Sequence, residues 1–214
     1  MAQSHEPIRL EARSSEQASE VMARAFQDDP AWKYLIPDAS RRLRLLPSFF
    51  SIVVRYSLLY GEVYTTSSLE GVACWLPPGN TSPRFTRLVR LGFRHASSGF
   101  ELGWTGFRRY ASMETYDGTV HQRFAPGKHW YLWALGVDPA YQGQGIGGML
   151  MQPVLARAEA EGLRCYLETS TEKNVAFYSK RGFTVVNEGL VPGSDLHVWA
   201  MMRYQQKLSE DRTQ

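Results

Sequence analysis

The chain has 214 residues, of which 43% are hydrophobic and 21% are charged. This composition is that of a globular protein able to bury a substantial core, and we predict a single domain over residues 1–214. The formal net charge of +3 gives no indication of nucleic-acid binding. Cys74 and Cys165 lie in apolar runs and are predicted core residues, so we expect neither a disulfide nor a metal site. A group of arginines is interpreted as a solvated helix face: Arg84, Arg87, Arg90 and Arg94.

The chain carries no clear targeting or membrane segment. Residues 1–7 contain no apolar stretch, so we predict no export signal and a cytoplasmic protein. The window from Leu45 to Tyr60 is apolar, but Pro47 and several polar residues interrupt it, and it is shorter than the roughly twenty residues that cross a bilayer. We interpret this window as a buried amphipathic helix that Gly61 ends, and we predict no membrane association.

Hydrophobic periodicity predicts alternating strands and helices in the first half of the chain. We expect a strand over residues 8–12, and then a helix opened by a capping box, Ser14-x-x-Gln17. A second helix is predicted from Ser40, followed by a hairpin of residues 62–66 and 71–76. From Ser82 to Arg123 the pattern is helical, and its glycines predict short or irregular helices: Gly92, Gly99, Gly103 and Gly106.

The most informative segment runs from Trp130 to Gly148. Residues 131–137 are nearly all apolar, as expected for a strand covered on both faces. A glycine-rich turn follows, and beyond it apolar residues recur at helical spacing. Glycines at the start of a helix let a ligand approach the unpaired N–H groups there, which lie at the positive end of the helix dipole. The segment therefore predicts a phosphate-binding loop.

Two kinds of nucleotide-binding protein use such a loop. Gly143-x-Gly145-x-x-Gly148 satisfies the dinucleotide pattern, and Glu168 stands about where a ribose-binding acid is expected. However, residues 138–142 separate the strand from the first glycine, whereas a dinucleotide fold places that glycine almost directly after its strand. Too few residues follow Glu168 for the remaining strand and helix units of such a domain. These two features argue against a dinucleotide site.

Two motifs instead resemble the GNAT superfamily of acetyl-CoA-dependent N-acetyltransferases. The first is Gln142-Gly-Gln-Gly145-Ile-Gly147, which matches the family signature Gln/Arg-x-x-Gly-x-Gly/Ala. The second, Asn-x-x-x-Tyr-x-x-x-Gly-Phe, stands at residues 174–183. The sequences of residues 25–30 and 167–170 are similar to those of the puromycin-acetyltransferase-like branch of this superfamily. The resemblance covers nearly the whole chain and is specific from about residue 130 to 186.

The resemblance implies an α/β fold with a mixed, twisted central sheet of about six or seven strands and helices on both faces. It places the cofactor-binding core at about residues 129–187, with strands 131–137 and 164–168 splayed apart around the pantetheine arm of acetyl-CoA. The remaining sheet strands are expected at residues 183–186 and 196–204, and a cap Thr169-x-x-Glu172 is expected to open the helix of the second motif. The implied cofactor-binding residues are Leu135, Gly136, Val137, Gln142, Gly143, Gln144, Gly145, Ile146, Gly147, Gly148, Asn174 and Tyr178.

Among those residues, Gly136 and Tyr178 admit two interpretations. Gly136 either lets backbone and ligand approach closely or permits a bulge, or it relieves crowding in the core, and we favour the ligand. Tyr178 is interpreted as the general acid that protonates the departing thiolate, rather than as a packing residue. Asn174, one helical turn earlier, shares its face. The backbone N–H of Leu135 is the oxyanion donor that the resemblance implies.

The general base is less defined, because some family members carry a glutamate where this chain has Tyr131. Glu168 is the first candidate for the base, acting directly or through a water. The alternatives are acidic or imidazole side chains near the predicted strands and the acceptor: His129, Glu114, Asp28 and Asp29.

The acceptor is predicted to be a small-molecule primary amine acetylated directly in a ternary complex. Aromatic residues between Ser82 and Arg123 are expected to wall its pocket, chiefly Trp104, Phe107 and Tyr110, although they are also compatible with ordinary core. Two alternatives stay open: acetylation of a protein or peptide amine, and a catalytically silent CoA-binding sensor on the same fold. A monomer or homodimer is expected.

Overall fold

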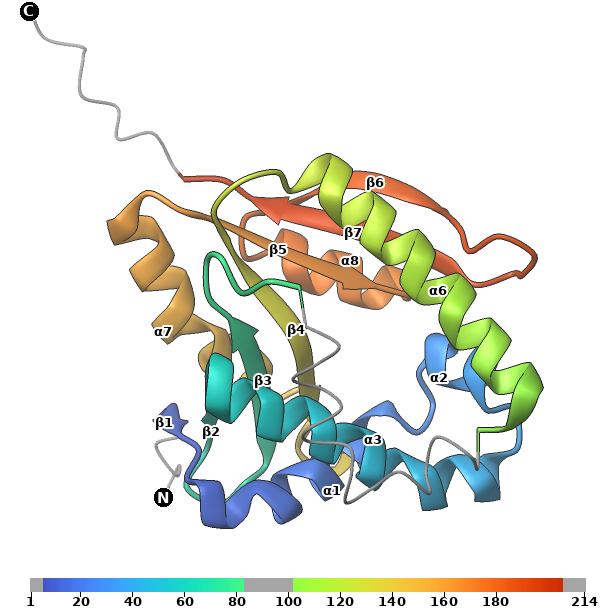
Figure 1. The fold of residues 1–214 in the computed structure, drawn as a ribbon. Coiled ribbons are helices and arrows are strands. Elements are labelled where there is room, and N and C mark those ends of the chain that lie inside the picture. The colour runs from blue at the N-terminus through green and yellow to red at the C-terminus, as the bar shows by residue number, and fades with distance from the viewer. Residues whose placement is uncertain (1–5, 83–101, 206–214) are drawn as a thin grey trace, which may run out of the picture.

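The computed structural model describes residues 6–82 and 102–205, and it contains a seven-stranded mixed sheet in the order β1-β2-β3-β4-β5-β7-β6 (Figure 1). The strands are β1 (Ile8–Arg9), β2 (Glu62–Thr65), β3 (Gly71–Leu76), β4 (His129–Val137), β5 (Arg164–Thr169), β6 (Phe183–Leu190) and β7 (His197–Arg203). The described helices are α1 (Ser15–Phe26), α2 (Pro30–Leu35), α3 (Ala39–Tyr60), α6 (Gly103–Phe124), α7 (Ile146–Glu161) and α8 (Glu172–Ser179). The predicted fold class is confirmed.

Helices cover both faces of the sheet, and alternation along β4 decides which side chains each face receives. Leu132 packs in the cluster formed with α7 and α8, whereas Tyr131 packs in the cluster below α6. Ala134 faces the cluster that contains α1 and α3. Side chains of β4 therefore alternate between a face toward α7 and α8 and a face toward α1, α3 and α6, and the extra residue Trp133 shifts the alternation so that Tyr131 and Ala134 share a face.

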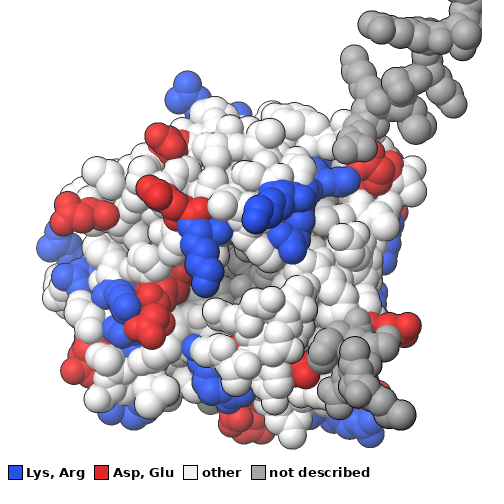
Figure 2. Space-filling model, turned by 180° about the vertical axis from the view of Figure 1, so that it is seen from behind, with Lys and Arg blue, Asp and Glu red and all other residues white. Residues whose placement is uncertain are grey.

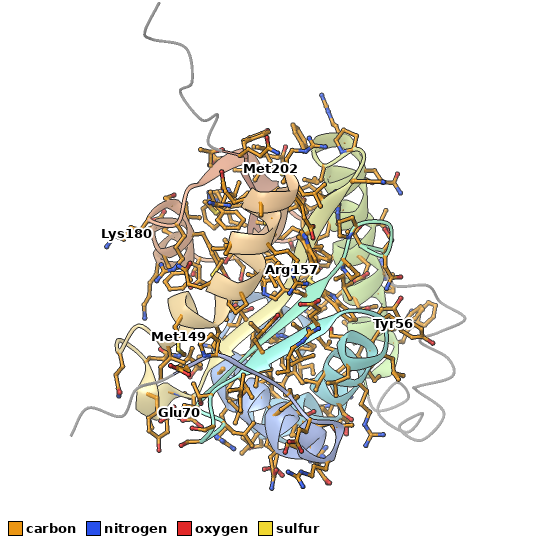
Figure 3. All side chains as sticks on the ribbon, turned by 90° about the vertical axis from the view of Figure 1, so that its left-hand side faces the viewer. Tyr56, Glu70, Met149, Arg157, Lys180 and Met202 are labelled. Atoms are coloured by element: carbon orange, nitrogen blue, oxygen red, sulfur yellow. The ribbon has the colours of Figure 1, made fainter. Side chains whose placement is uncertain are left out.

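The first face is tied together by Arg157 of α7, which is labelled in Figure 3. Its guanidinium donates to Glu62 Oε1 at 2.6 Å and lies over the Trp130 ring, 5.4 Å from the ring centroid. The neighbouring Glu62 Oε2 also pairs with Arg9 at 2.8 Å. These contacts fix α7 across β2 and β4, which sets the direction from which the helix N-terminus meets the end of β4.

On the second face, α3 extends over 22 residues and is long and apolar enough to cross a membrane by length and composition. The prediction that this segment is too short is therefore wrong, because the helix begins at Ala39, where the Asp38 side chain accepts from the Arg41 N–H. The helix packs on α1, and Leu46, Phe50 and Val54 are buried there. These contacts fit the interpretation as a core helix.

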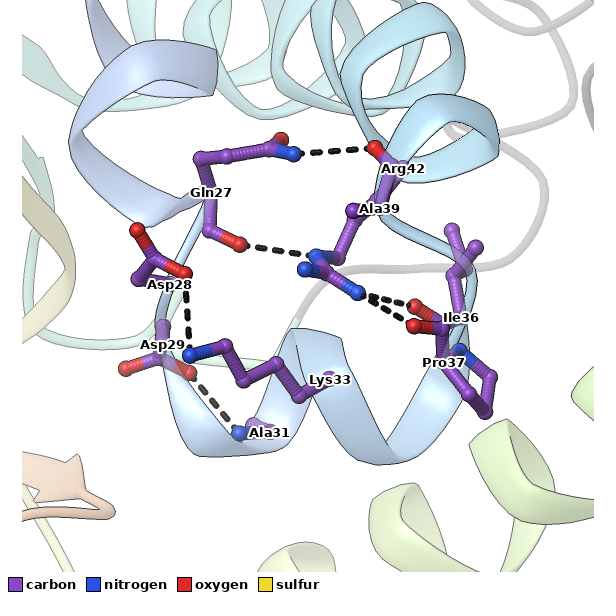
Figure 4. Close-up of polar contacts among 9 residues, drawn as sticks. All are labelled: Gln27, Asp28, Asp29, Ala31, Lys33, Ile36, Pro37, Ala39 and Arg42. Atoms are coloured by element: carbon purple, nitrogen blue, oxygen red, sulfur yellow. Dashed lines mark hydrogen bonds and ion pairs between the residues drawn. The ribbon is translucent and has the colours of Figure 1, made fainter.

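The corner between α1, α2 and α3 is held by the buried side chain of Arg42 (Figure 4). Its guanidinium donates to the carbonyl oxygens of Gln27 at 2.7 Å and Ile36 at 2.6 Å. Helix α2 was not predicted from the sequence. It begins at Pro30 after Asp29, whose carboxylate accepts from the Ala31 N–H at 2.9 Å, a combination that is typical of a helix start.

Three local predictions are wrong. Ser14 makes no capping bond, because a 3-10 turn over Ala12–Ser14 leads directly into α1. The cap of α8 is Thr171 rather than Thr169, and the Thr171 hydroxyl accepts from the Asn174 N–H at 3.2 Å.

The third wrong prediction concerns α6, which is continuous over 22 residues. Gly106 lies within this helix and does not break it. A Cβ at this position would lie 2.8 Å from the Leu102 side chain, so the glycine permits close packing there. The earlier part of that predicted helical region, residues 83–101, lies outside the described residues.

Candidate active site

The central feature of the site is the divergence of β4 and β5. These parallel strands are paired at His129 with Arg164, Trp130 with Cys165 and Tyr131 with Tyr166. Beyond Tyr131 and Tyr166 the two strands are no longer paired with each other, although β4 continues to Val137 beside β3 and β5 continues to Thr169 beside β7. The N–H and C=O groups on one edge of β4 are therefore available for a ligand that adds as a strand.

A β-bulge lies where the two strands separate. On the other edge of β4, Cys74 is opposite Ala134 and Trp75 is opposite Leu132, so Trp133 is the extra residue. A bulge bends its strand and increases the local twist, which helps β4 to leave β5. The prediction allowed a bulge at Gly136, three residues away. At Gly136, a Cβ would lie 2.8 Å from Met22 Sδ and 2.9 Å from Ala25 Cβ, which favours relief of crowding against α1 as the reason for this glycine.

The glycine loop follows β4 through a 3-10 turn, Pro139–Tyr141, and leads into α7. Gly143 and Gly145 have φ values of +82° and +84°, in the left-handed region that glycine adopts without strain. A Cβ at either position would meet no atom within 4 Å, so the space above the loop is open. The Gln142 side-chain amide donates to the Val137 carbonyl at 3.1 Å, which ties the loop to the end of β4.

The N-terminus of α7 is arranged to hold an anion. The helix has 16 residues, and the N–H groups of its first turn have no partner within the helix. Figure 2 shows a hollow near the centre of the face behind the view of Figure 1, with both basic and acidic side chains around it. Exposed glycine backbone and a helix N-terminus together fit the pyrophosphate of a coenzyme.

Arg181 lies at this loop and was not identified from the sequence. Its guanidinium stacks 3.6 Å from the Phe177 ring centroid and donates to the Phe177 carbonyl at 2.6 Å. A Cβ on Gly148 would collide with that guanidinium, so Gly148 leaves room for the arginine as well as for a ligand. Burial lowers the pKa of Arg181, although a guanidinium stays charged at neutral pH. The arginine therefore adds a fixed positive charge beside the first turn of α7.

Tyr178 and Asn174 lie on α8, as predicted. Tyr178 is 7% exposed and makes edge contacts with the Phe177 and Phe183 rings. Burial raises the pKa of its phenol, the charge of Asp29 raises it further and Arg181 offsets part of the rise. Asn174 is half-buried one turn earlier. A phenol with a raised pKa stays protonated at neutral pH, so its proton is present in the resting site, although the rise makes the phenol a weaker acid.

Glu168 lies on the other face of the sheet, in a partly buried polar cluster below α6. The cluster, which we call the Glu168 cluster, comprises Glu114, Asp117 and His121 of α6, His129 and Tyr131 of β4, and Tyr166 and Glu168 of β5. Three of its buried polar atoms have no partner in hydrogen-bond geometry among the described residues, although the Tyr166 hydroxyl lies close enough to Glu168 to influence its pKa: Asp117 Oδ1, Tyr166 Oη and Glu168 Oε1. Such atoms are costly in a closed core and are expected where a ligand or water completes the site.

Burial and like charge shift the acids of this cluster in one direction. Burial raises the pKa of Glu168 to about 8, and the Asp117 charge adds to the rise, while the nearby Tyr131 and Tyr166 hydroxyls oppose it. Burial, followed by the charge of Glu114, raises the pKa of Asp117 to about 7. Burial also raises the pKa of Glu114. A carboxyl with a pKa near 8 is well suited to take a proton from an amine.

The other base candidates have different surroundings. Asp28 is exposed and pairs with Lys33 at 2.9 Å, which lowers its pKa (Figure 4). Asp29 caps α2 and accepts from the Ser170 hydroxyl at 3.1 Å, just beyond β5. Its pKa is raised by burial, but both of its oxygens have structural partners. Glu114 and His129 belong to the Glu168 cluster.

The predicted acceptor-pocket residues separate into two groups. Trp104 and Phe107, at the start of α6, are 73% and 54% exposed and stack with ring centroids 6.2 Å apart. Tyr110 packs with the buried cluster of Leu35, Ile36, Leu45 and Leu102. The structure thus places Tyr110 with the core between α2, α3 and α6, and it presents the other two rings to the outside.

Asp117, His121 and Tyr166 were not identified from the sequence. A signal was available on α6, where Glu114, Asp117 and His121 follow one another at spacings of three and four residues. This spacing predicts one polar helix face. Which strand that face meets cannot be deduced from the spacing, because the partners come from β4 and β5.

Comparison with known proteins agrees with this geometry. The sequence profile of the Acetyltransferase (GNAT) family matches residues 102–183. An uncharacterized N-acetyltransferase of Schizosaccharomyces pombe is 27% identical over 183 residues, covering 82% of this chain and 72% of the relative. Against three further curated relatives the chain spans only 21%, 28% and 48% of their lengths.

Solved structures share the fold at low sequence identity. A Corynebacterium glutamicum protein named histone acetyltransferase HPA2 and related acetyltransferase has a TM-score of 0.66 at 18% identity, covering 96% of this chain and 98% of that one. Arylalkylamine N-acetyltransferase 2 of Aedes aegypti has a TM-score of 0.59 at 13% identity, covering 95% and 100%. Residues 102–183 therefore resemble the GNAT acetyltransferase family in sequence, and the chain shares its fold with these solved structures. The profile and the relative named as an N-acetyltransferase indicate an acyltransferase.

Proposed function

We propose that the protein transfers the acetyl group of acetyl-CoA directly to the primary amine of a small molecule, within a ternary complex. The observation that carries the proposal is the arrangement around the diverging strands. The glycine loop lies at the end of β4, and the Glu168 cluster lies on the α6 side of the sheet. A thioester held along the open edge of β4 would then be accessible to an amine from the α6 side.

Cofactor binding is assigned mainly to backbone. The N–H groups at the start of α7, with Gly143, Gly145 and the nearby Arg181, would hold the pyrophosphate. The open edge of β4 at Leu135 and Val137 would pair with the amide groups of the pantetheine arm, as in strand addition. Asn174, one turn before Tyr178 on α8, is proposed to complete the site.

The chemistry is assigned to three groups. Glu168 takes a proton from the acceptor amine, directly or through a water, so that the nitrogen can attack the thioester carbonyl. The N–H of Leu135 donates to the oxyanion that forms on that carbonyl. When the carbon–sulfur bond breaks, Tyr178 protonates the thiolate and recovers its proton from solvent. The acetylated amine and CoA are the products.

The acceptor is proposed to carry an apolar or aromatic body. Trp104 and Phe107 provide exposed aromatic surface at the start of α6, and rings of this kind bind apolar groups well. The insect neighbour of similar fold is named for arylalkylamines, whereas the bacterial neighbour is named for histones, so the neighbours' names do not decide between the two classes. The puromycin-acetyltransferase-like branch, a cytoplasmic location and a monomer or homodimer stay part of the proposal.

The test is release of CoA thiol from acetyl-CoA by the purified protein, measured with a panel of small amines and a panel of basic peptides. We expect at least one arylalkyl amine to be turned over far faster than any peptide, and Glu168→Gln to lower kcat/KM for it by about 10²-fold or more, as for loss of a general base. Efficient acetylation of peptides alone would overturn the assignment of a small-molecule acceptor. Binding of CoA without turnover of any amine or peptide would instead support a silent sensor.

A further inference from the structure

Two histidines, one buried and one half-buried, connect the Glu168 cluster to a backbone carbonyl. His129 Nδ1 lies 2.9 Å from the Gly127 carbonyl oxygen, and His129 Nε2 lies 2.8 Å from His121 Nε2. On the other side of its ring, His121 Nδ1 lies 3.8 Å from Glu168 Oε1. His129 is 2% exposed, and the His121 ring stacks on Tyr166 with centroids 4.3 Å apart. The four groups form a line from Gly127 to Glu168.

The tautomers of both rings follow from donor and acceptor roles. A carbonyl oxygen only accepts, so His129 Nδ1 must carry the hydrogen that bonds to Gly127. A neutral His129 then has a bare Nε2, which can only accept from His121 Nε2–H. A neutral His121 protonated at Nε2 has a bare Nδ1, and that nitrogen faces Glu168.

The surroundings keep both rings neutral. Burial lowers the pKa of His121 to about 4, and the neighbouring His129 contributes to the decrease. Burial also lowers the pKa of His129, and the charge of Arg164 lowers it further, although the Gly127 carbonyl opposes the change. Neither imidazole is therefore expected to be charged at neutral pH.

We propose that His129 and His121 are positioning residues that lock His121 in the Nε2–H tautomer, so that its bare Nδ1 favours the protonated form of Glu168. This inference rests on the proposed function, in which Glu168 is the base. The two atoms are 3.8 Å apart, beyond hydrogen-bond distance, so the effect is electrostatic: a protonated Oε1 presents its hydrogen to the bare nitrogen, whereas a carboxylate would face a lone pair. The lock therefore strengthens Glu168 as a proton acceptor.

The proton balance is simple. During acetyl transfer the N–H bond of the acceptor breaks and an O–H bond forms on Glu168, with the hydrogen directed at His121 Nδ1. The proton is lost to solvent after the products leave. The other titratable groups that face Glu168 are Asp117 and Glu114 from α6, Tyr131 from β4 and Tyr166 from β5. The two acids favour the same protonated state, while the two hydroxyls oppose it.

The first experiment reads the tautomers of the intact protein without any assay of activity. Proton–nitrogen correlation spectra of histidine-labelled enzyme distinguish protonated from bare ring nitrogens. We expect His129 to be protonated only at Nδ1 and His121 only at Nε2 at neutral pH. A charged His121, or one protonated at Nδ1, would overturn the proposal even if the enzyme is active and depends on Glu168.

The second experiment compares two variants of His129. In His129→Gln the side-chain carbonyl can still accept from His121 Nε2–H, and the lock is retained. In His129→Leu that acceptor is lost, and His121 can shift its hydrogen to Nδ1 and donate to the Glu168 carboxylate, which lowers the pKa of Glu168. We expect the rising limb of kcat/KM against pH to move by about one unit toward acid in His129→Leu and to stay in place in His129→Gln.

These outcomes separate the proposal from the function on which it rests. The affinity for acetyl-CoA should be equal in both His129 variants, because neither contacts the glycine loop. If both variants keep the limb of the wild type, or if both move it equally, the lock is excluded. If Glu168→Gln has full activity, the assignment of the base fails, whereas the tautomers read by the first experiment are still a valid test of the geometry.

Discussion

The two sides of the diverging strands differ in the chemical groups that they offer to a ligand. On the coenzyme side, the glycine loop is exposed, its glycines adopt left-handed conformations, and the groups that would bind are backbone N–H groups that do not titrate. On the α6 side, the Glu168 cluster is partly buried and consists of carboxyls, imidazoles and phenols whose pKa values burial shifts. A backbone site is sensitive to shape, and a cluster of titratable side chains is sensitive to charge and pH. Substitutions on the two sides should therefore fail in different ways.

The largest expected effect is on the coenzyme side, from Gly145→Glu. Gly145 has a φ of +84°, which strains any residue with a Cβ, and the new carboxylate would occupy the open space where phosphate is expected to bind. We expect acetyl-CoA to lose its stabilising effect in thermal unfolding, which for the wild type is about 2.7 kcal/mol at a hundredfold excess over Kd.

A matched control for that substitution is Gly193→Glu, in the turn between β6 and β7. Gly193 has a φ of +76°, and a Cβ there also meets no atom within 4 Å, so the backbone strain is similar. This variant should lose some stability but keep its stabilisation by acetyl-CoA. Equal stabilisation of both variants by the coenzyme would show that the loop does not bind it.

The difference between the two sides also explains what the sequence could predict. The glycine loop is local, so Gly143 and Gly145 stand a few residues apart in both sequence and space. The Glu168 cluster joins residues from α6, β4 and β5, and only Glu168, Glu114 and His129 were named as candidates. Arg181 reaches the loop from the end of α8, a contact that depends on how two helices pack. Helix α2 was missed, because six residues are too few to show periodicity.

The next effect in size concerns Tyr178→Phe, which removes the proposed acid but keeps the ring that packs against Phe183. We expect kcat to fall by about 10²-fold with little change in acetyl-CoA affinity, provided that chemistry limits the rate. Tyr204→Phe, at an exposed tyrosine beyond β7, is the control and should leave kcat unchanged. A Tyr178→Phe enzyme with the kcat of the wild type would reduce the tyrosine to a packing role.

A smaller change is expected from Asp117→Asn, which tests the charge-based side alone. Glu168 must be deprotonated to act as a base, so kcat/KM should rise with pH through its pKa of about 8. Because the Asp117 charge helps to raise that pKa, its removal should lower it and move the rising limb about one unit toward acid. Glu161→Gln removes the same charge at the exposed end of α7 and should not move the limb. A limb that Asp117→Asn leaves in place would show that the two carboxyls are not coupled in catalysis.

The smallest expected effect is that of Trp104→Ala, because a ring that is 73% exposed gives up little contact when it is removed. If Trp104 and Phe107 receive the apolar body of the acceptor, the KM for an arylalkyl amine should rise by roughly threefold, which is about 0.65 kcal/mol, while acetyl-CoA affinity stays constant. The KM for a short aliphatic amine should not change, since such a molecule cannot reach the ring. Leu59→Ala removes an exposed apolar side chain near the C-terminal end of α3 and controls for nonspecific loss of apolar surface. A weaker affinity for acetyl-CoA in Trp104→Ala, with an unchanged KM for the amine, would assign the ring to the coenzyme side and remove the aromatic pair from the acceptor site.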